Sequence, residues 1–363
     1  MKADTWQAEE KEVIHGMTRR RFIGAMGAMA LPSSAFGQGN AARVDLLAIG
    51  DWGAPTAPIP KEGLTAGDVK RLGGFQDEVA KAMADYAKSQ AARQQPITAV
   101  LALGDNFYGA LTGPADKRFQ DRFEKLYSKA DLNVPFHFVI GNHDYEDAPR
   151  NNFQHQIAYA RSTPGTRWTW VPADDKTWYA RDFPENEPLV TAVMLNTNTE
   201  VKPAAWVDQV QFLRDSLQTA KGRWRIVVAH HPMWTDGTHY PDTIGKGTVD
   251  TGLYPQMRAT ILPELKNVVF YVSGHDHNLQ SIQHKQYPDT HFFISGAGGG
   301  DYPTPKPKRP AQDKVDYTSE FNGVLGFLHL TFTAEAASAR FIGKDKKTGK
   351  WGAVGTEISR NAV

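Results

Sequence analysis

The chain has 363 residues, of which 40% are hydrophobic and 22% are charged. This is enough apolar material for a sizeable core and argues against disorder. Lys and Arg (41) nearly balance Asp and Glu (40), so no overall electric field directs the chain to nucleic acid or to a membrane. The absence of cysteine excludes disulfides and thiolate metal sites. Any metal must therefore bind to oxygen and imidazole ligands.

The first segment of the chain has the pattern of an export signal. Residues 18–23 read Thr-Arg-Arg-Arg-Phe-Ile, and a short apolar run ends at Leu31, before small residues that suit cleavage. The run is far shorter than the roughly 20 residues that span a bilayer. The order is similar to a twin-arginine signal, a route that exports folded proteins. The alternative is a basic amphipathic tail.

We therefore predict a twin-arginine-type signal peptide at 1–37 and export by the twin-arginine machinery of a bacterium. The mature protein is expected in the periplasm or outside the cell, without a membrane anchor. The next segment, 43–345, is expected to be a single domain, and 346–363 a C-terminal tail.

Apolar, β-branched runs recur along the chain and alternate with helical patterns. Runs typical of buried strands lie at 44–49, 97–103, 134–140, 190–195, 224–229, 268–272, 291–294, 325–332 and 339–342. Apolar residues at helical spacing occur at Phe75, Val79, Met83 and Tyr86, at Phe119, Phe123 and Tyr127, and at Val210, Leu213 and Leu217. This alternation predicts a layered α/β (α+β) fold rather than an all-β barrel.

Four other segments stand out by composition. Pro- and Gly-rich stretches at 54–63, 235–252 and 298–310 are predicted to be long surface loops, which in compact domains are usually functional or mobile. The aromatic-rich segment 167–183 is predicted to pack in the core or under loops.

The residues that carry chemistry follow the ends of five predicted strands. Because ligands bind at the carboxyl edge of open α/β sheets, these side chains are expected to converge. Glycines before most of them allow the sharp turns and close approach that such a site needs. Two histidines, His275 and His277, would face opposite ways in a regular strand, so a turn after Gly274 must bring both inward. The candidate ligands are Asp51, Asp105, Tyr108, Asn142, His230, His275 and His277.

These five blocks, in this order, resemble the calcineurin-like metallophosphoesterases, and more narrowly the small, tartrate-resistant purple acid phosphatases. The wider superfamily usually has a histidine two positions after the first aspartate, where this chain has Gly53. A phenolic donor, Tyr108, takes its place three positions after Asp105. The similarity runs from about residue 44 to 300, with a looser match at 325–332.

The resemblance implies a four-layer αββα sandwich of two mixed β-sheets flanked by helices, with two metal ions per subunit. Iron(III) is expected on Asp51, Asp105, Tyr108 and His277. A divalent ion (Fe, Zn or Mn) is expected on Asp105 as a bridge, with Asn142, His230 and His275. The adjacent His231 is the alternative to His230.

The resemblance further implies an acid phosphatase that hydrolyses phosphate monoesters by attack of a metal-bound hydroxide. His143 and His239 match histidines that face substrate in the family and are expected to assist catalysis. The partner is a small phosphorylated molecule, and no nucleic acid is required.

Two other functions are compatible with the same pattern. One is a phosphodiesterase or nucleotide-hydrolysing enzyme with the same metal site. The other is a non-catalytic, metal-stabilised binding protein. Three basic residues of the loop 298–310 either contact substrate or belong to a solvated loop: Lys306, Lys308 and Arg309.

Overall fold

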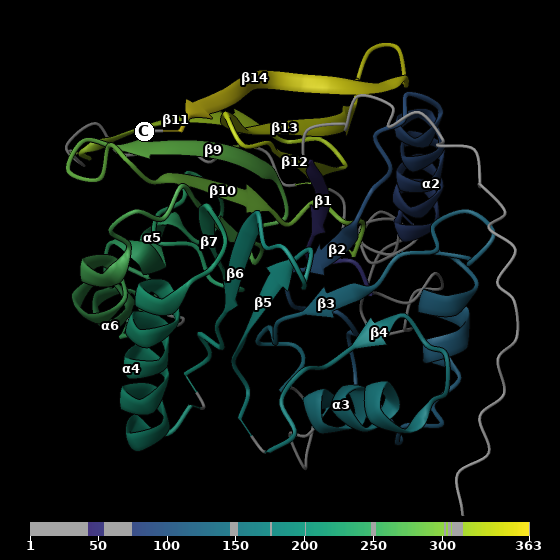
Figure 1. Cartoon of the computed structure of the whole chain (residues 1–363), viewed down its shortest axis with the longest axis horizontal. Coiled ribbons are helices and arrows are strands. Elements are labelled where there is room, and N and C mark those ends of the chain that lie inside the picture. Colours follow the sequence, from purple (N-terminus) through teal and green to yellow (C-terminus); the bar gives the residue numbers. More distant parts are fainter. Residues whose placement is uncertain are drawn as a thin grey trace, which may run out of the picture. The chain divides into compact units, whose positions relative to one another are not determined.

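Two seven-stranded sheets pack face to face in the computed structural model (Figure 1). The structure describes residues 43–53, 75–145, 152–174, 176–199, 201–247, 252–300, 303, 306 and 315–362. The expected signal peptide at 1–37 and the loop 54–63 therefore lie outside the described residues.

The first sheet contains the strands that carry the amino-terminal half of the predicted site. Its central strands run parallel in the order β1, β2, β3 and β4, and β12 pairs antiparallel with β1 on the other side. The strands are β1 (Val44–Ile49), β2 (Ala99–Ala102), β3 (Phe136–Phe138), β4 (Trp168–Thr169), β12 (Gly326–Phe332), β13 (Ala336–Lys344) and β14 (Trp351–Asn361).

The second sheet carries the carboxyl-terminal half of the predicted site. Its strands β6, β7, β8 and β10 are parallel, whereas β5, β9 and β11 are antiparallel to their neighbours. The strands are β5 (Tyr179–Phe183), β6 (Val190–Met194), β7 (Trp224–Val228), β8 (Phe270–Ser273), β9 (Leu279–His284), β10 (His291–Ser295) and β11 (Tyr317–Asn322). Both sheets are therefore mixed.

Helices cover the outer face of each sheet. The longer ones are α2 (Gln76–Ala92), α3 (Asn152–Ser162), α4 (Pro203–Thr219) and α6 (Leu253–Thr260). Shorter pieces are η1 (Phe119–Glu124), α5 (Tyr240–Thr243) and η2 (Leu262–Glu264). Successive strand residues point to opposite faces. Thus Leu46 packs between the sheets, whereas Leu47 packs with Met83 of α2.

The other sheet repeats this arrangement. Met194 of β6 lies between the sheets, whereas Val193 packs with Leu213 of α4. Three apolar layers therefore separate helix, sheet, sheet and helix. The predicted αββα sandwich is confirmed, as are the helical patterns of α2 and α4. The pattern at Phe119, Phe123 and Tyr127 is only partly helical, because the π-helix η1 ends at Glu124 and Tyr127 lies in the turn that follows.

The sheet extends beyond the boundary expected at residue 345. The segment 346–363 was expected to be a tail, but Trp351–Asn361 forms β14 and pairs antiparallel with β13. The strand is half-buried at Val354 and Ile358, against the core between the sheets, and at Trp351, against the core shared with α2. The remaining side chains are mostly exposed, so the sequence contains no apolar run that would predict this strand.

Two expectations about other segments have different outcomes. In the aromatic-rich segment, Trp168 and Trp178 are buried, as predicted. The stretch 235–252 is less loop-like than expected, because it includes α5, where Tyr240 and Thr243 are buried.

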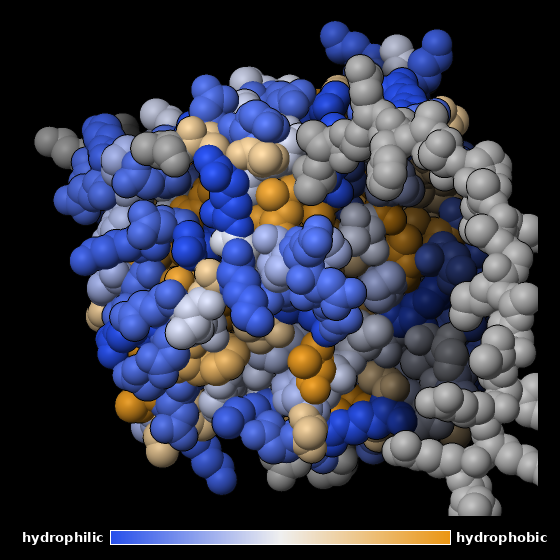
Figure 2. Space-filling model, viewed as in Figure 1, coloured by the Kyte–Doolittle hydropathy of each residue, from blue (hydrophilic) through white to orange (hydrophobic). Residues whose placement is uncertain are grey.

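The surface is largely hydrophilic on the face shown in Figure 2, with apolar side chains scattered in small groups. Among the described residues, Val171 and Val207 are the exposed large hydrophobic side chains. No helix in this part of the chain is long and apolar enough to cross a membrane.

Candidate metal centre

All seven candidate ligands lie at the carboxyl ends of parallel strands. Three segments come from the first sheet, after β1, β2 and β3, and two come from the second sheet, after β7 and β8. A direct link joins the two halves, because the backbone N–H of His275 donates to Asp51 Oδ2 at 2.9 Å. The site is therefore assembled across both sheets.

Tight backbone turns place the side chains at this edge. Asp51, Asp105 and His275 have φ values of 59°, 49° and 73°, a left-handed conformation that residues other than glycine rarely adopt. Such conformations cluster at functional sites, where the surrounding structure enforces them. The turn at His275 is the one expected after Gly274. It allows His275 and His277 to face the same site although they are two positions apart.

Two glycines are required for close packing around Asp105 and His230. A Cβ atom on Gly141 would lie 2.2 Å from Asp105 Oδ1, and one on Gly104 would lie 2.6 Å from His230 Nδ1. Gly104 also has a φ of 90°. Any side chain at either position would displace a candidate ligand.

One group of ligands consists of Asp51, Tyr108 and His277. The Tyr108 hydroxyl lies 3.2 Å from His277 Nε2, and Asp51 Oδ1 lies 3.6 Å from the same nitrogen. Burial lowers the pKa of His277 to about 4. Its imidazole is therefore neutral and able to act as a ligand.

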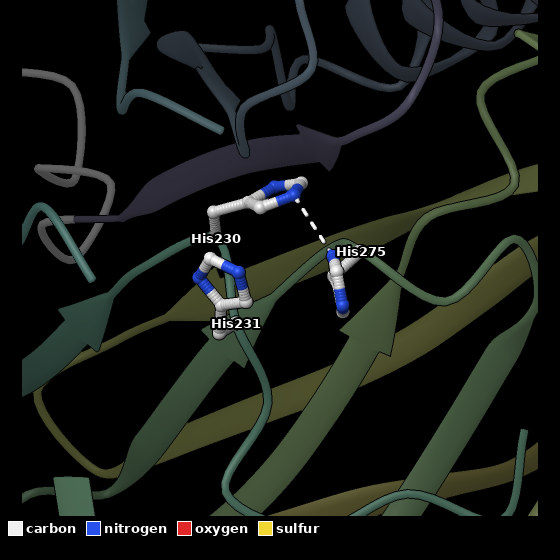
Figure 3. Close-up of side chains that lie close together, drawn as sticks. All are labelled: His230, His231 and His275. Atoms are coloured by element: carbon white, nitrogen blue, oxygen red, sulfur yellow. Dashed lines mark hydrogen bonds between the residues drawn. The ribbon is translucent and has the colours of Figure 1, made fainter. Parts of the chain in front are cut away.

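The second group consists of Asn142, His230 and His275. Asn142 Oδ1 lies 3.0 Å from His230 Nε2 and 3.1 Å from His275 Nδ1, and the two nitrogens are 3.3 Å apart (Figure 3). The ring N–H at His230 Nδ1 donates to the carbonyl of Leu103 at 2.8 Å, which leaves Nε2 for the site. Such a hydrogen bond from the other ring nitrogen is typical of metal-binding histidines.

The carboxylate of Asp105 lies beside the second group. Its Oδ1 is 3.4 Å from His230 Nε2 and accepts a hydrogen bond from the backbone N–H of His143 at 2.9 Å. Burial acts to raise the pKa of Asp105, but His230 and His143 hold that pKa well below its usual range. Asp105 is therefore ionised within a buried site.

The site favours a cation. Asp51 Oδ1 is buried and accepts no hydrogen bond from any residue the structure describes. Burial raises the pKa of Asp51 well above its usual value. Burial alone would lower the pKa of His230, but Asp105 and Asp51 raise it to about 9. A buried carboxylate oxygen that accepts no hydrogen bond, next to imidazole side chains, is a suitable ligand for a metal ion. The ion would take the place of the protons that these groups otherwise bind.

His231, the alternative ligand, is also close. Potential ligand atoms of His230, His231 and His275 lie within 4.8 Å of one another. However, His231 Nδ1 lies 3.0 Å from Thr197 Oγ1, which also accepts the backbone N–H of His231 at 3.1 Å. Thr197 thus holds His231, whereas His230 faces Asn142 and Asp105.

The two predicted catalytic histidines lie at the rim. His143 Nε2 is 3.9 Å from Asp105 Oδ2, and its ring lies 4.6 Å from the Tyr108 ring. The His239 ring lies 4.1 Å from the His275 ring, and its Nδ1 is 3.1 Å from Asp242 Oδ2. Both side chains are about a third exposed, at 32% and 30%. They are therefore accessible to a molecule that enters the site.

Sequence reasoning did not assign a role to Asp144, which follows His143. It is fully buried and accepts hydrogen bonds from the backbone N–H groups of Gly141 (2.8 Å) and Asn106 (3.1 Å), and from Gln156 Nε2 (2.7 Å). Burial and the charge of Asp105 raise the pKa of Asp144 to about 6. It joins the loops that follow β2 and β3. The sequence feature that could have indicated this role is the position of Asp144 inside the Gly-Asn-His-Asp block.

The basic residues of the loop 298–310 are only partly described. Lys306 Nζ lies 2.6 Å from Asp236 Oδ2, and that carboxylate is almost fully buried. Lys306 is therefore paired within the protein, an outcome that neither of the two alternatives, substrate contact or a solvated loop, describes. Lys308 and Arg309 lie outside the described residues.

Comparisons with known proteins show the family to which the chain belongs. The family described as calcineurin-like phosphoesterase matches residues 45–279. Tartrate-resistant acid phosphatase type 5 of Sus scrofa is 30% identical over 319 residues, covering 82% of each chain. The Homo sapiens protein of that name is 29% identical, covering 87% of this chain and 91% of that one. Purple acid phosphatase 17 of Arabidopsis thaliana is 27% identical, covering 82% and 80%.

Two solved structures share the fold. GAP50, the anchor in the inner membrane complex of Plasmodium, has a TM-score of 0.64 at 20% identity, covering 88% of this chain and 89% of that one. PhoD has a TM-score of 0.54 at 12% identity, covering 89% and 70%. At these identities the likeness shows the fold alone.

Proposed function

Because the chain belongs to the calcineurin-like phosphoesterases, and within them to the purple acid phosphatases, we propose that it hydrolyses phosphate monoesters at a two-metal centre. The observation that carries this proposal is the convergence of two ligand groups beside one carboxylate, Asp105, which would bridge the ions. Potential ligand atoms of Asp51, Asp105 and His230 all lie within 4.8 Å of one another. The relatives named acid phosphatases support the same activity.

The two groups of candidate ligands correspond to the two metal ions that the family resemblance implies. Asp51, Tyr108 and His277 would hold iron(III) together with Asp105. A phenolate and two carboxylates are hard, negative donors, which suit a trivalent ion. Asn142, His230 and His275, also with Asp105, would hold a divalent Fe, Zn or Mn ion.

The bound ions would polarise a phosphoryl oxygen and lower the pKa of water. Of the five positive charges that a trivalent and a divalent ion bring, Asp51, Asp105 and a Tyr108 phenolate offset three. The remaining positive charge favours binding of a phosphate anion and stabilises the charge that develops during hydrolysis. An iron(III) ion held by Asp51, Asp105, Tyr108 and His277 would lower the pKa of water further than a divalent ion would, which is the physical reason to expect an acidic optimum.

His143 and His239 would act on the substrate. Both are accessible at the rim, and each lies against a candidate ligand ring, Tyr108 or His275. A histidine there can donate a hydrogen bond to a phosphoryl oxygen or protonate the departing alcohol.

Metal analysis and kinetics on one purified sample test the proposal. We expect two metal ions per chain, one of them iron, and hydrolysis of a phosphomonoester with an acidic optimum. A strong preference for a diester substrate would instead assign the site to the phosphodiesterase alternative. A fully metal-loaded chain that hydrolyses neither ester would overturn the proposal and favour a binding protein.

We also propose export by the twin-arginine machinery, on the basis of the Arg19-Arg20-Arg21 block. Replacing Arg19, Arg20 and Arg21 together with lysine should retain the protein in the bacterial cytoplasm. Immunoblots of periplasmic and cytoplasmic fractions, with the unaltered chain as control, provide the measurement. Unchanged export of the variant would contradict this route.

A further inference from the structure

Asp276 lies between two candidate ligands, His275 and His277, but its carboxylate contacts a different part of the site. It is fully buried and packs against the loop that follows His230 and carries His239. A buried carboxylate is costly unless it is hydrogen-bonded, so its partners indicate its role.

Those partners all lie on the loop that carries His239. Asp276 Oδ1 accepts hydrogen bonds from Thr238 Oγ1 at 2.9 Å and from the backbone N–H of His239 at 3.2 Å. Asp276 Oδ2 accepts a short hydrogen bond from Thr235 Oγ1. The carboxylate thus fixes both ends of a five-residue segment that ends at His239.

The surroundings leave little freedom to this arrangement. A Cβ atom on Gly237 would lie 2.5 Å from Asp276 Cγ, so only glycine lets the loop close on the carboxylate. Thr235 Oγ1 also accepts hydrogen bonds from the Gly237 N–H and from Gln280 Nε2, both at 2.8 Å. Its single proton is therefore directed to Asp276.

The His239 ring completes the geometry. Its Nδ1 faces Asp242, and its ring lies against His275. Among the residues that the structure describes, none forms a hydrogen bond with His239 Nε2. A fixed backbone and a fixed Nδ1 leave this nitrogen for a substrate.

We infer that Asp276 is a positioning residue, which holds the loop 235–239 so that His239 stands beside the metal centre. The effect on catalysis rests on the proposed function, since it acts through His239. Asp276 itself touches neither substrate nor reacting atoms.

A double-mutant cycle tests this inference. Asp276→Asn is expected to lower kcat/KM for a phosphomonoester by about 10- to 100-fold, the size of effect that small misplacements of catalytic groups produce. Most of the loss should fall on kcat. In a His239→Ala background the same substitution should cause little further loss. Thr238→Val, which removes one donor from the loop side, should give a smaller effect of the same kind.

Controls separate positioning from general damage. Asp45→Asn removes another buried carboxylate, on a strand of the first sheet, and should leave kcat/KM unchanged. Metal content should remain at two ions in Asp276→Asn. Loss of metal, or losses that simply add to those of His239→Ala, would overturn the inference.

If the unaltered protein hydrolyses no phosphate ester, the proposed function is wrong, but the positioning role can still be tested by a second measurement. Backbone amide hydrogen exchange of residues 235–239 should be faster in Asp276→Asn than in the unaltered protein. Exchange in β1 should not change. Equal exchange rates in the loop would refute the positioning role whatever the activity.

Discussion

The Tyr108 hydroxyl and His277 Nε2 lie 3.2 Å apart, although 169 positions separate the two residues in the chain. Tyr108 follows a strand of the first sheet, and His277 follows a strand of the second. Their contact depends on the packing of the two sheets. The contact also joins Tyr108, the residue that distinguishes this chain from the wider superfamily, to another candidate ligand.

The first prediction concerns Tyr108. An iron(III)–phenolate pair should produce a visible charge-transfer band, and Tyr108→Phe should remove it because the phenolate oxygen is lost. Absorption spectra of the two proteins at equal iron content provide the measurement. Tyr86→Phe removes a phenol that is hydrogen-bonded to His329 outside the site, so it serves as a matched control with an unchanged spectrum. A colourless but fully loaded natural protein would exclude iron(III) on Tyr108.

The second prediction concerns Asn142. Its Oδ1 contacts both His230 and His275, so Asn142→Ala should weaken the divalent site first. We expect the divalent ion to be lost on dialysis while the iron remains, and kcat to fall by about two orders of magnitude or more. Elemental analysis after dialysis separates the two ions. Retention of both metals at full activity would show that the two groups are divided incorrectly.

The third prediction concerns Asp144. Asp144→Ala would remove the acceptor of buried N–H donors in the loops after β2 and β3 and of the Gln156 side chain in α3. We expect a loss of about 3 kcal/mol in the free energy of unfolding, measured by urea denaturation. Asp121→Ala, which removes an exposed aspartate paired with Lys125, should cause no measurable change. A stability equal to that of the unaltered protein would contradict the bridging role.

The fourth prediction concerns the pH dependence of stability through Asp45. Burial acts to raise its pKa, but hydrogen bonds from His329, Arg43 and Thr331 lower that pKa below the ordinary value of 3.8. A lowered folded-state pKa stabilises the protein above the unfolded pKa, and this contribution is lost as the pH falls through the folded pKa.

Asp45→Asn should therefore destabilise the protein by about 3 kcal/mol at neutral pH, because it breaks a buried charged network. The difference between the two proteins should shrink as the pH falls below about 4. Urea denaturation at neutral pH and at several acidic values provides the measurement. A difference that grows in acid would contradict the sign of this pKa shift.

Much of the fold could be predicted because its central strands are buried on both sides. Apart from Asp45 and Thr191, the residues of β1 and β6 are apolar and face a core in either direction, so their sequences are nearly continuous apolar runs. β14 and β11 are only partly buried and lack such runs. Pairing with a neighbouring strand, rather than their own composition, determines their structure.

The candidate ligands could be proposed because each follows a recognisable strand end. The residues that position these candidate ligands could not be identified from the sequence. Asp276 and Asp144 lie in the same short blocks as ligands, but whether a side chain in a turn points to the metal or to a neighbouring loop depends on local dihedral angles. The left-handed φ of 73° at His275, next to Asp276, is part of this local geometry and cannot be read from residue order. Similarly, Lys306 was compatible with substrate binding until its contact with Asp236 became visible.

The distribution of the ligands over both sheets has a consequence for biosynthesis. Asp51, Asp105 and Asn142 belong to the first half of the site, and the last candidate ligand, His277, is synthesised 226 positions after Asp51. A complete two-ion site can form only after the second sheet has docked against the first. Tight metal retention would therefore report that a molecule has finished folding, and a chain interrupted before His275 would be left with a site that cannot retain both ions.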